Sequence, residues 1–106
     1  MRSANNRITV QQLRYLMKTA ETGSVTDAAR ELGISQSTLS EALSQMENAT
    51  GFTILARSRK GATPTPLGTE FLHYAQGVVN RMDDLERRFI IGFPSKNKFR
   101  IASQSF

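Results

Sequence analysis

The first half of the chain carries apolar residues at a helical spacing. One apolar face follows Thr9 at positions i, i+3, i+4 and i+7, formed by Leu13, Leu16, Met17 and Ala20. Thr9 and Gln12 can form a capping box, and Thr22-Gly23 is a typical helix end. Two further helices are predicted over about residues 25–32 and 36–50. In the third helix one apolar face is shared by Leu39, Ala42, Leu43 and Met46.

The second and third helices are joined in the manner of a helix-turn-helix. Ser24 and Asp27 have the spacing of a capping box, and Ser35 is a good N-cap for the third helix. Between the helices, Gly33 can adopt the positive φ that ends a helix, and Ile34 fills the corner. In such a motif the second helix lies in the DNA major groove.

After residue 51 the pattern becomes that of a small hairpin. Phe52, Ile54 and Leu55 indicate a short strand, residues 57–61 an exposed turn, and residues 62–64 a return strand weakened by its proline. A hairpin that follows a helix-turn-helix has the layout of a winged helix, so the predicted fold class is mainly α with a small β-hairpin wing.

A long helix is predicted from Thr65-Pro66, an N-cap followed by proline at the first helical position, to about Ile91. Apolar residues step along it by 4, 3, 4, 3 and 4, as in a heptad seam: Phe71, Ala75, Val78, Met82, Leu85 and Phe89. A helix of this length spans roughly 39 Å, more than so small a domain can cover. Part of the seam should therefore pack on a second copy; the alternative is packing within the monomer alone.

Composition and charge narrow the class of partner. The chain has 106 residues, 39% of them hydrophobic, which suits one domain with a modest core. Its net charge of +5 favours a polyanionic partner. There is no cysteine, hence no disulfide or thiolate site, which agrees with a cytoplasmic location. No signal peptide and no membrane-spanning run is recognised, so no membrane partner is expected.

The polar face of the third helix carries the candidate DNA-reading residues. Opposite its apolar face lie Ser37, Ser40, Glu41 and Ser44, with Gln36 at the helix start. Gln can bond adenine bidentately, and short hydroxyls allow close approach to phosphates and base edges. The alternative is an ordinary solvated face. Glu41 either accepts a hydrogen bond from a cytosine amino group or rejects sequences that offer no donor.

The predicted turn of the hairpin carries the candidate phosphate-contacting residues. Between Glu47 and Glu70 the only charges are those of Arg57, Arg59 and Lys60. Beside Gly61 they suit a wing that reaches a phosphate ridge or the minor groove. Arg57 lies closest to the strand, and a structural role for it is an equal alternative.

The sequence gives little support for a metal site or for catalysis. His73, the only histidine, has no cysteine or carboxylate at metal-ligand spacing, and residues 83–86 give an acidic patch most simply explained as solvated. No nucleophile–base pair is recognised, so we expect no enzyme, no catalytic or metal residue and no cofactor. The competing hypothesis from another class is a winged-helix protein-interaction module without DNA binding.

Taken together, the chain resembles the N-terminal DNA-binding region of LysR-type transcriptional regulators over about residues 9–91. Four blocks carry the resemblance by their order and spacing: QQLRYL, GSVTDAARELGISQSTLS, GFTILAR and TPTPLG. Where that family usually has phenylalanine, this chain has Val25; where it has proline, this chain has Ser37; and where it often has arginine, this chain has Glu41. The last difference implies a bound sequence unlike the commonest family sites.

The resemblance implies roles for individual positions. Those that would face the major groove are Gln36, Ser37, Thr38, Ser40 and Glu41. Arg57 and Lys60 would approach backbone or minor groove, and Thr26 would contact a phosphate. The linker helix would pair with its partner in a homodimer, or in a tetramer of the full-length protein, on an AT-rich dyad operator.

It also implies a division of the chain: a winged helix-turn-helix over 1–65, a linker and dimerisation helix over 66–91, and a hinge with the start of an effector-binding domain over 92–106. Residues 98–106 resemble the first strand of that domain, so the chain is expected to be a fragment. A small-molecule effector would bind only through the rest of that domain.

Overall fold

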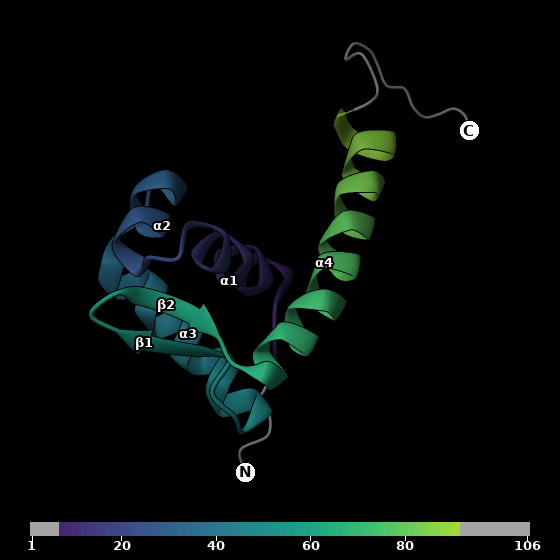
Figure 1. Cartoon of the computed structure of the whole chain (residues 1–106). Coiled ribbons are helices and arrows are strands. Elements are labelled where there is room, and N and C mark those ends of the chain that lie inside the picture. The colour runs from purple at the N-terminus through teal and green to yellow at the C-terminus, as the bar shows by residue number, and fades with distance from the viewer. Residues whose placement is uncertain (1–6, 92–106) are drawn as a thin grey trace.

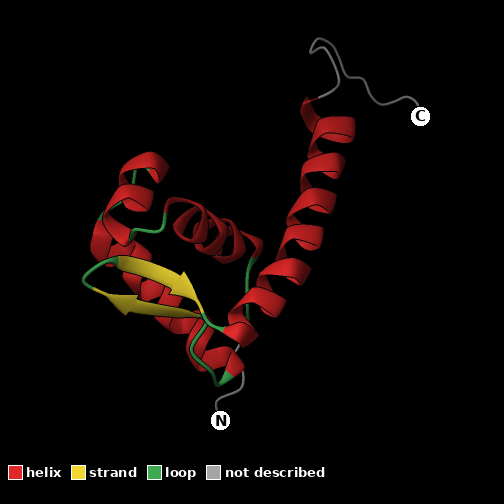
Figure 2. Cartoon of the chain, viewed as in Figure 1, coloured by secondary structure: helices red, strands yellow, loops and turns green. Residues whose placement is uncertain are grey.

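Three helices, a two-stranded hairpin and a long helix follow one another in the computed structural model, which describes residues 7–91 (Figures 1 and 2). The elements are α1 (Val10–Thr22), α2 (Val25–Leu32), α3 (Gln36–Thr50), β1 (Leu55–Ser58), β2 (Gly61–Pro64), α4 (Pro66–Glu86) and a π-helical end, η2 (Arg87–Ile91). The mainly α winged helix-turn-helix predicted from the sequence is confirmed. The expected hinge and strand over 92–106 lie outside the described residues.

Local capping interactions set the helix ends. Thr9 and Gln12 form the predicted capping box at α1, with both hydrogen bonds at 3.0 Å. Gly33 ends α2 at φ 73°, and the Ser35 side chain caps α3. All four residues act where the sequence pattern predicted.

The capping box predicted at the start of α2 is only half formed. The Ser24 hydroxyl accepts from the Asp27 amide at 3.1 Å, as expected. The Asp27 carboxylate, however, accepts from the Arg30 guanidinium at 3.1 Å instead of reaching back. The Ser24 amide donates to the Thr22 hydroxyl at 3.3 Å, so a neighbouring threonine replaces the acid in the box.

The hairpin is shifted along the sequence relative to the prediction. Its antiparallel register pairs Leu55 with Pro64 and Ser58 with Gly61, so β1 begins at Leu55 rather than Phe52. Arg57 and Ser58 therefore belong to a strand, and the turn is shorter than the predicted 57–61. Residues before β1 are held by other elements: the Phe52 ring packs edge-on against the ring of Phe71, with centroids 6.3 Å apart.

The core forms where α1, α2 and α3 meet. Leu16, Leu39, Leu43 and Met46 are buried there, and Ala28 and Ala29 allow α2 to approach closely. Burying each large apolar side chain contributes about 1.5–3 kcal/mol to the free energy of folding. The apolar face predicted for the third helix is thus confirmed as its core face, which leaves its opposite side exposed.

The first turns of α4 lie against this body. A Cβ at Gly68 would collide with the Ile54 carbonyl oxygen, so a side chain there would push the helix away. Farther along, Ala75 is only 3% exposed within the core, and Phe71 packs partly buried against it. Of the predicted seam, the monomer itself therefore buries Ala75 and half-buries Phe71, so these two positions pack at least in part within one copy.

The later part of α4 rises away from the body (Figure 1). Three residues of the predicted seam are exposed in this part of α4 and in η2: Val78 by 46%, Leu85 by 50% and Phe89 by 60%. Met82 is half-buried. The seam is therefore split, its first part facing the monomer core and its later part facing outward.

Ion pairs connect this part of α4 to α1. The Arg14 guanidinium lies 2.8 Å from the Asp83 carboxylate and 3.7 Å from that of Glu86. Asp84 pairs with Arg87 at 2.9 Å. The acidic patch expected to be merely solvated is thus engaged, and two of its members link two helices.

Candidate nucleic-acid interface

The polar side of α3 is exposed on the surface of the molecule. Ser40 is half-buried, and the other predicted readers on this helix are exposed: Gln36, Ser37, Thr38, Glu41 and Ser44. The buried apolar residues of α3 hold the helix against the body, so these side chains point outward together. A helix with one anchored and one free polar side can be presented to a groove as a rigid unit.

Hydroxyl groups are connected at the start of α3. The Ser35 hydroxyl accepts from the Thr38 amide at 3.1 Å, donates to the Thr38 hydroxyl at 2.8 Å and lies 3.2 Å from that of Ser37. Three small polar side chains are thereby held at a helix N-terminus, where the partial positive charge of the helix favours a phosphate.

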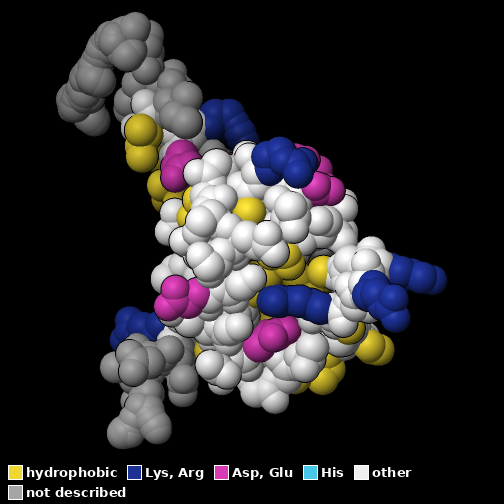
Figure 3. All heavy atoms as spheres, turned by 90° about the vertical axis from the view of Figure 1, so that its left-hand side faces the viewer, with side chains coloured by type: hydrophobic (Ala, Val, Ile, Leu, Met, Phe, Trp, Pro, Cys, Tyr) yellow, Lys and Arg dark blue, Asp and Glu magenta, His cyan; other side chains and the backbone are white. Residues whose placement is uncertain are grey.

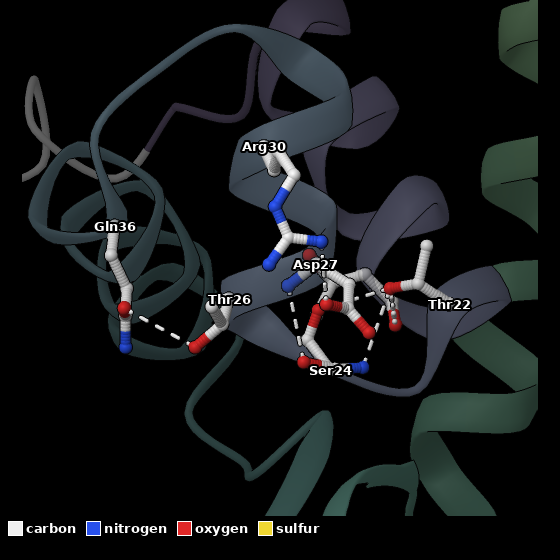
Figure 4. A network of polar contacts seen from close by, with 7 residues as sticks. Thr22, Ser24, Thr26, Asp27, Arg30 and Gln36 are labelled. Atoms are coloured by element: carbon white, nitrogen blue, oxygen red, sulfur yellow. Dashed lines mark hydrogen bonds and ion pairs between the residues drawn. The ribbon is translucent and has the colours of Figure 1, made fainter.

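Gln36 is oriented from α2. The Thr26 hydroxyl donates to the Gln36 side-chain oxygen at 3.2 Å, across the turn between the helices (Figure 4). This contact leaves the Gln36 amide nitrogen able to donate to another acceptor. Both residues were predicted to face DNA, whereas the hydrogen bond between them was not predicted.

Arg30 was not among the residues predicted from the sequence to contact DNA. It follows Thr26 by one helical turn, and residues four apart share one side of a helix. Its guanidinium is exposed and pairs with Asp27 on the same helix (Figure 4). The exposed cation makes Arg30 a further candidate contact, and its i, i+4 spacing from Thr26 is the sequence signal for it.

Two contacts fix the hairpin beside the helix-turn-helix. The Ala62 amide donates to the Gly23 carbonyl oxygen at 2.9 Å, in the turn between α1 and α2. Gly61 has φ 131°, and a Cβ there would collide with the same oxygen. A glycine is therefore required at this point, for its backbone conformation and for its close approach.

A carboxylate from α3 holds the other end of the hairpin. One Glu47 oxygen accepts from the amides of Ile54 at 2.8 Å and Leu55 at 3.2 Å. The first residue of β1 is thereby attached to α3. No local pattern in the sequence predicted this role, because the partners lie seven and eight residues away across a loop.

A cleft of about 300 Å³ lies between α3 and the hairpin, and it brings together predicted residues from three elements. Its lining includes Thr26 from α2, Gln36 and Ser40 from α3, and Arg57 and Arg59 from the hairpin. The other predicted residues lie outside the lining but on exposed surface: Ser37, Thr38, Glu41, Ser44 and Lys60.

The charged side chains of the hairpin are positive, and they form no ion pair among the described residues. Arg57, Arg59 and Lys60 are exposed, and none of them forms an ion pair within residues 7–91. Figure 3 views the left-hand side of Figure 1, where Lys and Arg side chains project from a surface that is largely uncharged. Guanidinium and ammonium groups without internal partners can bind phosphates without first breaking an ion pair.

The described residues offer little for a metal site. Residues 7–91 contain no group of three or more His, Cys, Asp or Glu side chains able to hold a metal ion. His73 is exposed and packs edge-on against Tyr74, with ring centroids 5.6 Å apart. Within the described ranges, no helix has the length and apolar character needed to cross a membrane.

Comparison with known proteins gives one consistent family. The small neutral protease regulatory protein of Streptomyces coelicolor (strain ATCC BAA-471 / A3(2) / M145) is 42% identical over 78 residues, which cover 74% of this chain and 24% of that protein. This chain thus spans about a quarter of the length of that relative.

Two solved structures share the fold. The oxidized form of Corynebacterium glutamicum OxyR matches with a TM-score of 0.75 and 32% identity, over 77% of this chain and 25% of that one. The crystal structure of a CbnR_DBD–DNA complex matches with a TM-score of 0.71 and 29% identity, over 76% of this chain and 92% of that one. CbnR is described as a LysR family transcriptional regulator.

The family model described as "Bacterial regulatory helix-turn-helix protein, lysR family" matches residues 10–69, which include α1, α2, α3 and the hairpin. The family resemblance predicted from the sequence is thereby confirmed, together with a fold that matches the winged-helix DNA-binding domains of LysR regulators. The chain therefore belongs to the lysR family of bacterial regulatory helix-turn-helix proteins.

Proposed function

We propose that this chain binds double-stranded DNA sequence-specifically as a homodimer, with α3 in the major groove and the hairpin on the backbone or minor groove. The observation that carries the proposal is the cleft in which Gln36 of α3 and Arg57 of β1 face one space. In the proposal, the Gln36 amide reads a base and the Arg57 guanidinium binds a phosphate, and their position on one cleft supports this pairing of roles.

Within this arrangement the side chains divide into two tasks. Gln36 reads a base, with Thr26 holding its amide oxygen at 3.2 Å until a base edge replaces that contact. Arg59 and Lys60 at the tip of the hairpin bind phosphates, which position the protein without reading sequence. Arg57 lies in β1 and lines the cleft, so it supports both the wing and the groove contact.

The exposed side of α4 supports the proposed dimer. Apolar side chains lie along one stripe that runs from α4 into η2, with exposed fractions between 46% and 68%: Leu67, Tyr74, Val78, Leu85 and Phe89. They step by 7, 4, 7 and 4 residues, the spacing of a helix–helix seam. A second copy on this stripe would cover side chains that the monomer leaves in water, and it would place two recognition helices on one duplex.

Regulation by the longer protein extends the proposal. Residues 1–65 serve as the DNA-binding unit and 66–91 as the linker, while a further domain would bind a small-molecule effector and allow tetramers. The operator would be an AT-rich dyad, and the protein would act in the cytoplasm.

The test measures binding of the 106-residue chain to duplex DNA as a function of salt. Each neutralised phosphate contributes a slope of about −0.9 to the dependence of log K on log salt concentration. Arg57, Arg59 and Lys60 together would give a slope of at least about −2.7 per protomer. Flat salt dependence, or no binding at low salt, would favour the protein-interaction module instead.

Two variants separate reading from positioning. Gln36→Ala should lose about 1–3 kcal/mol of binding free energy on a selected site and relax the preference at one base pair. Lys60→Ala should weaken binding to all sequences about equally and reduce the salt slope by about 0.9. Equal effects of the two variants on selected and random DNA would contradict the assignment of Gln36 as a reader.

A further inference from the structure

Glu41 stands apart from most of the acidic side chains of this chain. The sequence has nine acidic residues, all within the described range. All but two are used internally, in ion pairs or hydrogen bonds: Glu21, Asp27, Glu31, Glu47, Asp83, Asp84 and Glu86. Among residues 7–91, Glu41 and Glu70 have neither kind of partner.

Glu41 lies in the middle of the exposed side of α3. It lies one turn after Ser37 and one turn before Ser44, so the three share one side of the helix. Its neighbours in this row carry short hydroxyl side chains, which let the helix backbone come close to base edges. Glu41 is the longest side chain in the row and the only charged one, so it reaches farthest from the helix.

The cations of the hairpin form no ion pair with the Glu41 carboxylate. Arg57, Arg59 and Lys60 are exposed on the hairpin, yet none lies within 4 Å of a carboxylate in the described part of the chain. A carboxylate without a partner on a surface that meets phosphates weakens general affinity for DNA. Any favourable contribution of Glu41 to binding must therefore come from the choice among base pairs.

The chemistry of the major groove limits that choice. An ionised carboxylate only accepts hydrogen bonds, and the groove offers donors only at cytosine N4 and adenine N6. Adenine places its N7 acceptor beside N6, which would repel the second carboxylate oxygen, whereas cytosine has no acceptor on its groove edge. Guanine and thymine present acceptors to the carboxylate.

We propose that Glu41 selects one cytosine in each half-site by accepting a hydrogen bond from its N4 amino group. This inference rests on the proposed placement of α3 in the major groove. Glu41 then determines specificity mainly by penalising the other bases, because a desolvated carboxylate that meets an acceptor has lost its water without gaining a donor.

The experiment selects binding sites from a random duplex library with four proteins: wild type, Glu41→Ala, Glu41→Gln and Glu70→Gln. The wild type should enrich cytosine at one position of each half-site. Glu41→Ala should lose that preference at this position alone, and Glu41→Gln should change it to adenine, which glutamine bonds bidentately. Glu70→Gln is the matched control, since it neutralises the other unpartnered acid, on α4, and should leave the consensus unchanged.

Binding to the wild-type consensus and to a copy with the cytosine replaced gives the magnitude. The wild type should discriminate roughly 5- to 150-fold, and Glu41→Ala hardly at all. The thermal midpoint of Glu41→Ala should match the wild type, because no internal contact is removed. An identical consensus for wild type and both Glu41 variants would overturn the inference and leave the proposed function intact; absence of any selected site for the wild type would overturn both.

Discussion

Replacement of Glu47 by alanine should destabilise the fold more than the same replacement of any other acidic residue. One Glu47 oxygen accepts from the Ile54 and Leu55 amides at 2.8 and 3.2 Å. Both of these residues are nearly inaccessible, at 1% and 3% exposure. In the alanine variant two backbone donors lose their acceptor at the point where the chain enters the hairpin.

The magnitude follows from this geometry. A buried donor left without a partner costs about 1–3 kcal/mol. Glu47 is itself half-buried, so water can replace part of the contact and the lower half of that range applies to each amide. The two amides together give about 2–4 kcal/mol of lost unfolding free energy, a large share of the 5–15 kcal/mol typical of a domain.

Urea unfolding followed by circular dichroism at one fixed protein concentration is the assay. With the slopes usual for small domains, the midpoint should fall by about 1 M or more. Glu47→Gln keeps an acceptor oxygen and should lose less, while Glu70→Ala removes an exposed acid and should stay within about 0.5 kcal/mol of the wild type. Hydrogen exchange at the Ile54 and Leu55 amides should accelerate only in the Glu47 variants. Equal midpoints for Glu47→Ala and Glu70→Ala would refute the reasoning.

Three further outcomes are expected from other parts of the molecule. Gly61→Ala should loosen the hairpin and lower the thermal midpoint, because a Cβ would strike the Gly23 carbonyl oxygen; an unchanged midpoint would show that the close approach is unimportant. Leu85→Glu should leave the winged helix folded but make the chain sediment as a monomer at micromolar concentration, where the wild type should be a dimer. A hydrogen bond to Glu21 is the main cause that raises the pKa of Lys18 above its usual 10.5. The stability that protonated Lys18 adds should therefore be present below pH 10.5 and be lost as the pH rises through the raised pKa. In Glu21→Gln, an NMR titration should find a lower pKa for Lys18 than in the wild type.

Helix positions could be predicted from the sequence because their causes are local. Thr9, Ser35 and Thr65 each cap the helix that follows within three residues, and Gly33 and Gly51 each adopt a left-handed conformation directly after a helix. Periodicity then separated the buried face of α3 from its polar face. Such information lies within one or two helical turns, which is the range that a sequence pattern covers.

The hairpin and the long helix were predicted less well because distant residues decide them. The start of β1 depends on Glu47 in α3, and the side of α4 that faces the core depends on how closely Gly68 approaches Ile54. Asp83 was likewise predicted to be a solvated acid, because its partner Arg14 lies on a helix distant in the sequence. None of these contacts leaves a periodic mark in the sequence.

The candidate site divides in the same way. The residues of α3 could be found from the polar side of one helix, whereas the cleft that joins Gln36 to Arg57 arises only when the hairpin is docked. The contact from Thr26 to Gln36 likewise depends on the crossing of two helices. The residues could be predicted from the sequence, and the fold determines which of them lie together.

The central claim, that α3 and the hairpin form the DNA-binding surface, is tested most directly by mapping amide NMR signals of the 106-residue chain during titration with a selected DNA duplex. The account predicts that the largest shifts fall on residues 26, 36–44 and 57–60, and that they grow smaller as salt is added. Large shifts confined to α4, with unchanged signals in α3 and the hairpin, would contradict it.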